Sequence, residues 1–498
     1  MTSKSTLKSD KFPAPVYAET ILAPNFADAQ KHFFQALMHI HYAHAVMLTR
    51  QQIISREEAK TILTGLDNLD RAKIRRARYD GSVEDLFFFV ERELIKLIGE
   101  DLAGKLHIAR SRNDIDVTLY RMRLREEVWS LANDLAALRA ELIKLAQANL
   151  KTVMPAHTHT QPAQPTTLAH YLSAAIEFLS RDITRLKAAF AGVNRSPLGA
   201  CAITTTGFPI DRELTAKLLG FEAVVENSYG AIGGIDYLLE AVSALATSAV
   251  SLGKFTQDLL LWATQEFSYI RLSDAYVQTS SIMPQKRNPV SLEHTRILLS
   301  KAFGQAQAVM TSVHNTPFGD INDVEDDLQP LVFSTFSEAS RAIRLLAGSV
   351  SAIQVDREAL RKKAAGSFLT MTELADTLVR EEGLSFKAAH RLVALAAKRL
   401  PGVEASHEEI VSALLAVAED TLDRALKTDR ATLINALSPV HFVEVRQVFG
   451  GPAIVQVSAF LARQKEIAAE DRRWAKEKAG LLVAFPEKIE REKKRLTV

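Results

Sequence analysis

The chain has 498 residues, of which 47% are hydrophobic and 24% are charged, the composition of an ordinary soluble globular protein. The net charge of +2 gives no electrostatic case for nucleic acid as the main partner. The single cysteine, Cys201, excludes an intrachain disulfide and fits a reducing compartment. We find neither an apolar run long enough for a membrane span nor the apolar segment of a secretory signal in residues 1–19. We therefore expect a cytoplasmic protein with no membrane partner.

Helical periodicity dominates the chain. Apolar residues recur at alternating spacings of four and three along a stretch that includes Leu124, Val128, Leu131, Leu135, Leu138, Leu142 and Leu145. This heptad pattern predicts one long helix that packs in a bundle along its length. Further helices are expected over 168–193, 231–266, 291–313 and 332–355. We expect an all-α protein with an N-terminal helical domain (1–112), a central bundle (113–364) and a C-terminal helical domain (365–498).

Two polar segments interrupt the helical pattern in the first half of the chain. Residues 106–114 gather hydroxyl, guanidinium and amide groups, which are suited to binding an anion. Asp114 can instead cap the helix that follows. Residues 155–167 contain three prolines among polar side chains, which favours a structured loop.

The most informative segment is Ser280–Pro289, which we call the signature loop. Pro284 and Pro289 fix the backbone and exclude helix before them, so this segment breaks the helical pattern. Between them lie two cations, a carboxamide and an amide, preceded by two serines. This content suits an anion site in which a serine hydroxyl is held where it can react.

Histidines raise a second possibility, a metal site. His41 and His44 could share one helix face, and His157 and His159 form a pair separated by one residue. No third group of ligands supports either pair, so we favour core or interface histidines and expect no metal.

Residues 104–114, 154–167 and 280–293 resemble, in order and spacing, the three motif regions of the aspartase/fumarase superfamily. Within it the chain is most similar to the argininosuccinate lyases, also over 265–276 and 374–379. The resemblance implies a homotetramer with a central bundle of twenty helices, whose active sites each draw the three regions from three chains. It implies release of fumarate, a small dicarboxylate substrate, and no metal or organic cofactor.

The resemblance also implies residue roles. Ser281 would be the general base, activated by Lys286, and His159 would orient or protonate the leaving group with Glu293 as its charge partner. The developing dianion and the succinyl group need donors and cations. The residues expected to bind them are Ser111, Arg112, Asn113, Thr158, Gln161, Ser280, Met283 and Asn288.

Five positions depart from the argininosuccinate lyase pattern. Phe26 and Gln30 stand where the family carries a serine and an aspartate that hold the amino-acid end of the substrate. Ile235 replaces an arginine, Leu328 a lysine and Glu325 a glutamine. We therefore expect a carbon–nitrogen lyase acting reversibly on another N-succinyl amine, an aminopolycarboxylate such as ethylenediamine-N,N′-disuccinate.

Three alternatives remain beside this interpretation. The first is argininosuccinate lyase with a diverged pocket. The second is a catalytically inactive structural protein of the crystallin type, against which the presence of Ser281, His159 and Lys286 argues. The third is a metallohydrolase built on the histidine pairs.

Overall fold

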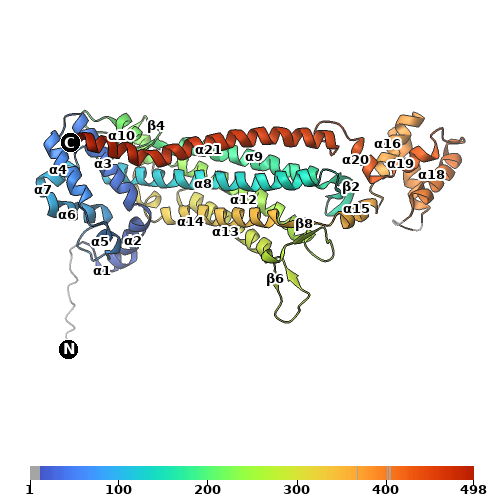
Figure 1. Cartoon of the computed structure of the whole chain (residues 1–498), viewed down its shortest axis with the longest axis horizontal. Coiled ribbons are helices and arrows are strands. Elements are labelled where there is room, and N and C mark those ends of the chain that lie inside the picture. Colours follow the sequence, from blue (N-terminus) through green and yellow to red (C-terminus); the bar gives the residue numbers. More distant parts are fainter. Residues whose placement is uncertain (1–11, 367, 401, 403–404, 498) are drawn as a thin grey trace.

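The computed structural model describes residues 12–366, 368–400, 402 and 405–497. Residues 1–11 of the expected N-terminal domain lie outside this description. The molecule is elongated: long helices run along its length, with a group of short helices at each end (Figure 1). The prediction of an all-α fold is confirmed.

Long helices side by side form the central bundle. They are α8 (Arg112–Ala148), α9 (Leu168–Val193), α12 (Asp236–Trp262), α13 (Val290–Ser312) and α14 (Gln329–Ser351). The heptad positions of α8 are buried from Leu124 to Leu142, and α8 packs against α9 and α14. The expected long helix is therefore present, and its apolar stripe faces its neighbours.

The last helix, α21 (Ile454–Thr497), returns along this bundle to the N-terminal end, where the C-terminus lies (Figure 1). It packs against α8 and α9 and, further along, against the N-terminal helices α3 and α4. Buried Val457, Leu461 and Phe485 belong to the same core as the bundle. Residues 454–497 thus pack with the bundle, although they belong to the expected C-terminal domain; the domain boundaries themselves stay a prediction.

The N-terminal group consists of short helices. They are α1 (Pro15–Tyr17), the π-helical turn η1 (Ala18–Leu22), α2 (Ala23–His32), α3 (Phe34–Arg50), α4 (Arg56–Asp67), α5 (Arg71–Arg76), α6 (Leu86–Ile98) and α7 (Glu100–Lys105). Capping side chains fix where several of these helices begin. Ser55 and Glu58 form a capping box at the start of α4, and the Asp70 and Asp85 carboxylates accept a hydrogen bond from the backbone N–H of the third residue of α5 and α6.

The C-terminal group has its own hydrophobic cluster, which includes Leu374, Leu392, Leu414 and Leu433. Its helices are α15 (Arg357–Ala365), α16 (Met371–Glu382), α17 (Phe386–Lys398), α18 (His407–Leu422), α19 (Arg430–Ala436) and α20 (Pro439–Glu444). Shorter helices connect the bundle elsewhere: α10 (Arg212–Leu218), α11 (Ser228–Gly233), η2 (Asp274–Tyr276) and η3 (Asn322–Val324).

The described part of the chain also forms four short two-stranded ribbons. They are β1 (Val153–Thr158) with β2 (Gln161–Thr167), β3 (Arg195–Ser196) with β4 (Ala223–Val224), β5 (Ile270–Leu272) with β8 (Ile353–Val355), and β6 (Gln278–Thr279) with β7 (Arg287–Asn288). All pairs are antiparallel except β3–β4. Two of the predicted loops, 155–167 and the signature loop, are therefore organised by ribbons.

One described stretch, Ser228–Trp262, is long and apolar enough to cross a membrane by length and composition. In the structure 56% of its most apolar window is buried. Its main part, α12, packs against α9, α13 and α14, so its apolar character serves the core of the bundle.

Candidate active site

Ser111, Arg112 and Asn113 stand at the start of α8. The Ser111 backbone N–H donates to the Asp114 carboxylate over 2.8 Å, so Ser111 is the N-cap and Asp114, inside the first turn, is its partner in a capping box. The other oxygen of Asp114 accepts from the Gly199 N–H over 2.7 Å. Asp114 is fully buried and therefore ties the start of α8 to the 196–205 segment. The Ser111 hydroxyl donates to the Asn113 side-chain oxygen over 2.8 Å.

Carboxylates surround these three residues. Arg112 forms ion pairs with Asp85 and Glu84, and the Asn113 amide donates to Asp320. Burial and then the neighbouring charge of Asp320 raise the pKa of Glu325 to about 7, because both disfavour its ionised form. The acidic run 320–327 is visible in the sequence, but only the folded chain places it beside Arg112 and Asn113.

Burial and the charge of Asp326 likewise raise the pKa of Asp116. Asp326 accepts a 2.8 Å hydrogen bond from the hydroxyl of the buried Tyr120. Asp116 and Tyr120 belong to α8 and Asp326 precedes α14, so this region joins the beginnings of two bundle helices.

Thr158, His159 and Gln161 lie at the tip of the β1–β2 hairpin and are exposed. The hairpin turns through His159 and Thr160, which have φ values of 51° and 63°. Positive φ at both residues of a two-residue turn matches the twist of the strands, but it is unfavourable for side chains larger than glycine or asparagine. Such local strain is frequent at functional sites.

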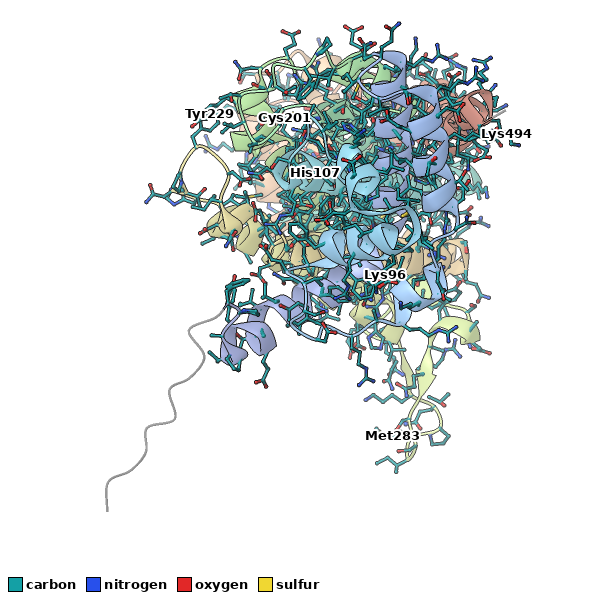
Figure 2. The ribbon with its side chains drawn as sticks, turned by 90° about the vertical axis from the view of Figure 1, so that its left-hand side faces the viewer. Lys96, His107, Cys201, Tyr229, Met283 and Lys494 are labelled. Carbon is teal, nitrogen blue, oxygen red and sulfur yellow. The ribbon has the colours of Figure 1, made fainter. Side chains whose placement is uncertain are left out.

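The signature loop projects from the bundle and carries Met283 at its tip (Figure 2). The β6–β7 ribbon forms its base, where Arg287 pairs with Asp274 and donates to the Leu272 carbonyl over 2.9 Å. Ser281 and Lys286 are exposed on the loop, and Asn288 is half-buried in β7. Glu293 is exposed in the first turn of α13.

Ser280 has a structural role beside the one expected from the resemblance. Its hydroxyl oxygen accepts from the backbone N–H groups of Ile282 at 3.3 Å and Met283 at 3.1 Å, which closes a turn at the beginning of the loop. This turn sets the path of the backbone on both sides of Ser281.

One chain does not bring the three segments together. Ser111 precedes the first residue of α8, and Thr158 follows its last turn within the hairpin. A helix of 37 residues is about 55 Å long, so these two segments lie at opposite ends of the bundle. The signature loop leaves the bundle between those ends (Figure 1).

The histidines of α3 have ordinary structural partners. His44 Nε2 lies 2.8 Å from the Ile108 carbonyl oxygen, and Arg110 donates to His41 Nδ1 over 2.9 Å. Burial lowers the pKa of His44 to about 3 and that of His41 well below its ordinary value, which favours neutral rings. Within the described residues, no group of three histidine, cysteine or acidic side chains could hold a metal ion.

Comparisons with known proteins decide the family. The model of a family described as "Lyase" matches residues 18–304, and the model described as "Argininosuccinate lyase C-terminal" matches residues 368–444. The chain is 44% identical over 447 residues to "Argininosuccinate lyase 2" of Agrobacterium fabrum, covering 89% of each chain. It is 36% identical to the argininosuccinate lyase of Methanosarcina acetivorans, covering 97% of this chain and 98% of the relative.

The chain belongs to the aspartase/fumarase superfamily. Among its members it is argininosuccinate lyase-like, and it is a carbon–nitrogen lyase. The crystal structure of EDDS (ethylenediamine-N,N′-disuccinate) lyase in complex with formate is similar, with a TM-score of 0.86 and 30% identity over 96% of this chain and 97% of that one. A variant of EDDS lyase with bound fumarate gives a TM-score of 0.84 and 29% identity over the same shares.

These findings support the alternative substrate better than the one we favoured from the sequence. The relatives at 44% and 36% identity are named argininosuccinate lyases, whereas EDDS lyase is similar at 30%. The matched family and these argininosuccinate lyase relatives are lyases, which supports an enzyme over the alternative of a structural protein of the crystallin type.

Two of the positions that we expected to depart from the argininosuccinate lyase pattern have structural roles. Phe26 is buried, with its ring centroid 5.6 Å from that of Phe89 and 5.9 Å from that of Tyr79. The Gln30 side-chain amide donates to two backbone carbonyls at the end of α5, over 2.6 and 2.9 Å. Both side chains therefore hold the N-terminal helices together.

Proposed function

We propose that this lyase eliminates an amine from an N-succinyl substrate and releases fumarate. The observation that carries the proposal is that three polar segments bear the groups that such an elimination needs on a chain of this family: Ser111, Arg112 and Asn113 are half-buried, while Thr158, His159, Ser281 and Lys286 are exposed. A neighbour of the same fold has fumarate bound, which supports the same product here.

The chemistry assigns a role to each segment. Ser281 removes the proton from the carbon beside the carboxylate, with Lys286 and Asn288 stabilising the negative charge that develops there. The electrons of that C–H bond form the double bond of fumarate, and the C–N bond breaks. His159, paired with Glu293, supplies or guides the proton that the departing nitrogen needs. The remaining groups hold the succinyl part: Ser111, Arg112, Asn113, Thr158, Gln161, Ser280 and Met283.

The active site is completed by other copies of the chain, in a homotetramer. The separation of two of the segments by the length of α8 supports the use of more than one chain per site, if the three segments act together. Exposed apolar side chains on two bundle helices support such an assembly: Val250 and Leu261 on α12 and Ile297 on α13 are 47%, 41% and 61% exposed. A bundle that presents such side chains outward can bury them against a second bundle. We place this assembly in the cytoplasm.

Argininosuccinate is the first candidate substrate, because the relatives at 44% and 36% identity carry its name. An aminopolycarboxylate such as ethylenediamine-N,N′-disuccinate is the second. The observation that favours the second is the structural use of Phe26 and Gln30, which leaves neither side chain free to hold the amino-acid end of argininosuccinate. A buried charge without its partner costs about 3–5 kcal/mol, so this end would bind poorly.

The test measures fumarate formation by ultraviolet absorbance with each of the two substrates under the same conditions. A larger kcat/KM for argininosuccinate supports the first candidate and means that the departures from the argininosuccinate lyase pattern are neutral changes. A larger value for ethylenediamine-N,N′-disuccinate supports the second. Fumarate from neither substrate, nor from a panel of other N-substituted aspartates, would refute the proposed elimination.

A further inference from the structure

The β1–β2 hairpin that carries His159 is poorly supported on one side. A cavity of about 730 Å³ lies between this hairpin, α9, α12 and the segment joining α20 to α21. Its wall on the hairpin side includes Met154, Ala156, His157 and Gln164. Side chains that face a cavity open to solvent have no protein packing partners on that side, so contacts elsewhere must fix where the hairpin lies.

Those contacts come from the C-terminal group. Helices α15 and α20 pack against the hairpin strands. The Gln164 side-chain amide donates to the Thr372 hydroxyl over 3.3 Å. His170, in the first turn of α9, lies with Nδ1 2.8 Å from the Thr166 hydroxyl of β2 and with Nε2 2.9 Å from the Gly450 carbonyl oxygen. The hairpin is thus attached to the beginning of α16 and to the segment after α20.

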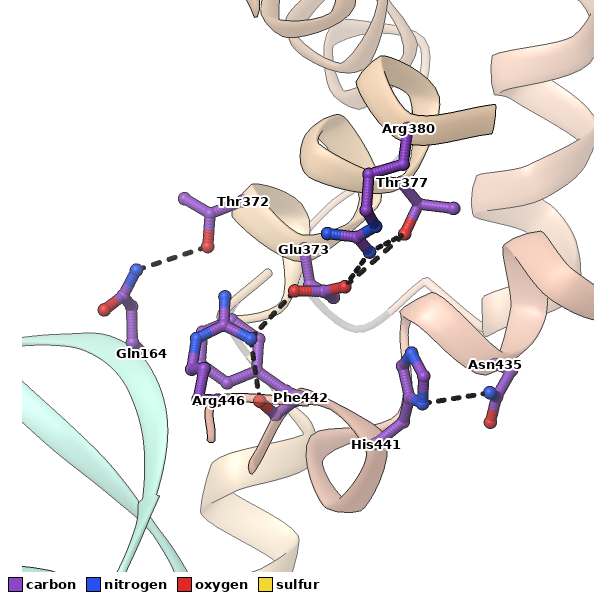
Figure 3. A network of polar contacts seen from close by, with 9 residues as sticks. All are labelled: Gln164, Thr372, Glu373, Thr377, Arg380, Asn435, His441, Phe442 and Arg446. Atoms are coloured by element: carbon purple, nitrogen blue, oxygen red, sulfur yellow. Dashed lines mark hydrogen bonds and ion pairs between the residues drawn. The ribbon is translucent and has the colours of Figure 1, made fainter. Parts of the chain in front are cut away.

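Glu373 connects these two attachment points (Figure 3). It is 1% exposed, and Arg446 donates to one of its carboxylate oxygens over 2.8 Å while Arg380 binds the other. Arg446 also donates to the Phe442 carbonyl over 2.7 Å, and its guanidinium lies 3.2 Å from the centre of the Phe442 ring. Phe442 and Arg446 also line the cavity.

We propose that Glu373 is a positioning residue for the reaction. Through Arg446 it fixes α20 and the segment that follows. Its neighbour Thr372 binds Gln164 of β2, so strands β1 and β2 hold His159 in one orientation. This inference rests on the proposed function, in which His159 acts on the leaving group. Replacing the buried carboxylate removes the charged partner of the half-buried Arg446 and of Arg380, and this loosens the supports of the hairpin.

The test uses Glu373→Gln in the full-length assembled protein. We expect kcat to fall by on the order of 10²-fold, because small misplacement of a catalytic group has effects of this size. We also expect faster amide hydrogen exchange in a peptide covering residues 153–167. The matched control is Glu382→Gln. Glu382 is the last residue of α16, at the opposite end of the helix from Glu373, and its buried carboxylate binds Arg424 and Thr428. This control should leave both kcat and exchange of the hairpin close to the parent.

Equal hairpin exchange in the parent and Glu373→Gln would overturn the proposal, whatever happens to turnover. So would equal effects of the two variants, since a general loss of stability in the C-terminal group would then explain both. A third variant separates the inference from the proposed function. If His159→Asn leaves turnover unchanged, the assigned role of His159 fails, while the exchange measurement still decides whether Glu373 holds the hairpin.

Discussion

Arg139 of α8 donates to the carboxylate of Asp471 in α21 over 2.7 Å, and both side chains are almost completely buried. Arg139 also donates to the Ser180 hydroxyl of α9 over 2.9 Å, and Lys187 of α9 binds the other oxygen of Asp471. Three helices therefore meet at one buried charged site. A buried pair of this kind is costly to break because the partner left behind keeps its charge.

Asp471→Ala should lower the free energy of unfolding by about 3–5 kcal/mol, because it leaves Arg139 buried without a counter-charge. Urea denaturation at fixed protein concentration measures the change. Glu470→Ala is the control, since Glu470 is exposed and makes only a 3.9 Å ion pair with Arg473, so its loss should cost less than about 1 kcal/mol. Similar losses in the two variants would refute the importance of this site.

Ser281→Ala should lower kcat by about 10²–10⁴-fold while the assembly stays intact, because the hydroxyl is assigned the role of general base. Fumarate formation measures kcat, and light scattering after size exclusion measures the assembly. Ser312→Ala removes an exposed hydroxyl at the end of α13 and should change neither quantity. Activity of Ser281→Ala within a few-fold of the parent would exclude this serine as the base.

Mixed assemblies should regain activity that their parents lack. Ser281→Ala and His159→Asn each inactivate every site in their own tetramers, but if one site draws the two residues from different chains, about one site in four of a random mixture receives both intact. The two variants are dissociated, mixed and reassociated before fumarate formation is measured. No recovery, with mixing verified by mass spectrometry, would mean that one chain supplies both residues.

Glu325 should make stability depend on pH. Its pKa is raised from 4.5 to about 7, so the folded state holds a proton that the unfolded chain releases between these values. The stabilisation is complete below about pH 4.5 and is lost as the pH rises through about 7. Glu325→Gln should therefore reduce the fall in Tm between about pH 5 and about pH 8, and Asp327→Asn, at an exposed neighbour, should not. An unchanged pH dependence in Glu325→Gln would contradict the assigned titration.

The sequence by itself determined the bundle. The spacing of apolar residues from Leu124 to Leu142 predicts α8 because a helix turns every 3.6 residues, and the same stripe is buried in the structure. Helix α9 spans the predicted range 168–193. Its start is predictable because the proline-containing segment 155–167 interrupts helical periodicity just before Leu168. Residue types at Ser281, Lys286 and His159 also indicated the chemistry, since local motifs retain their content whatever the surrounding fold.

Only the tertiary structure decided how those motifs are held. The hairpin turn at His159 and Thr160 has positive φ at residues that give no sequence signal for it, because pairing of Val153–Thr158 with Gln161–Thr167 imposes the turn. Glu373 meets Arg446 across 73 positions in the chain, and Arg139 meets Asp471 across 332. Such contacts depend on how helices pack after folding, and side-chain pairing at this separation leaves no periodic pattern in one sequence.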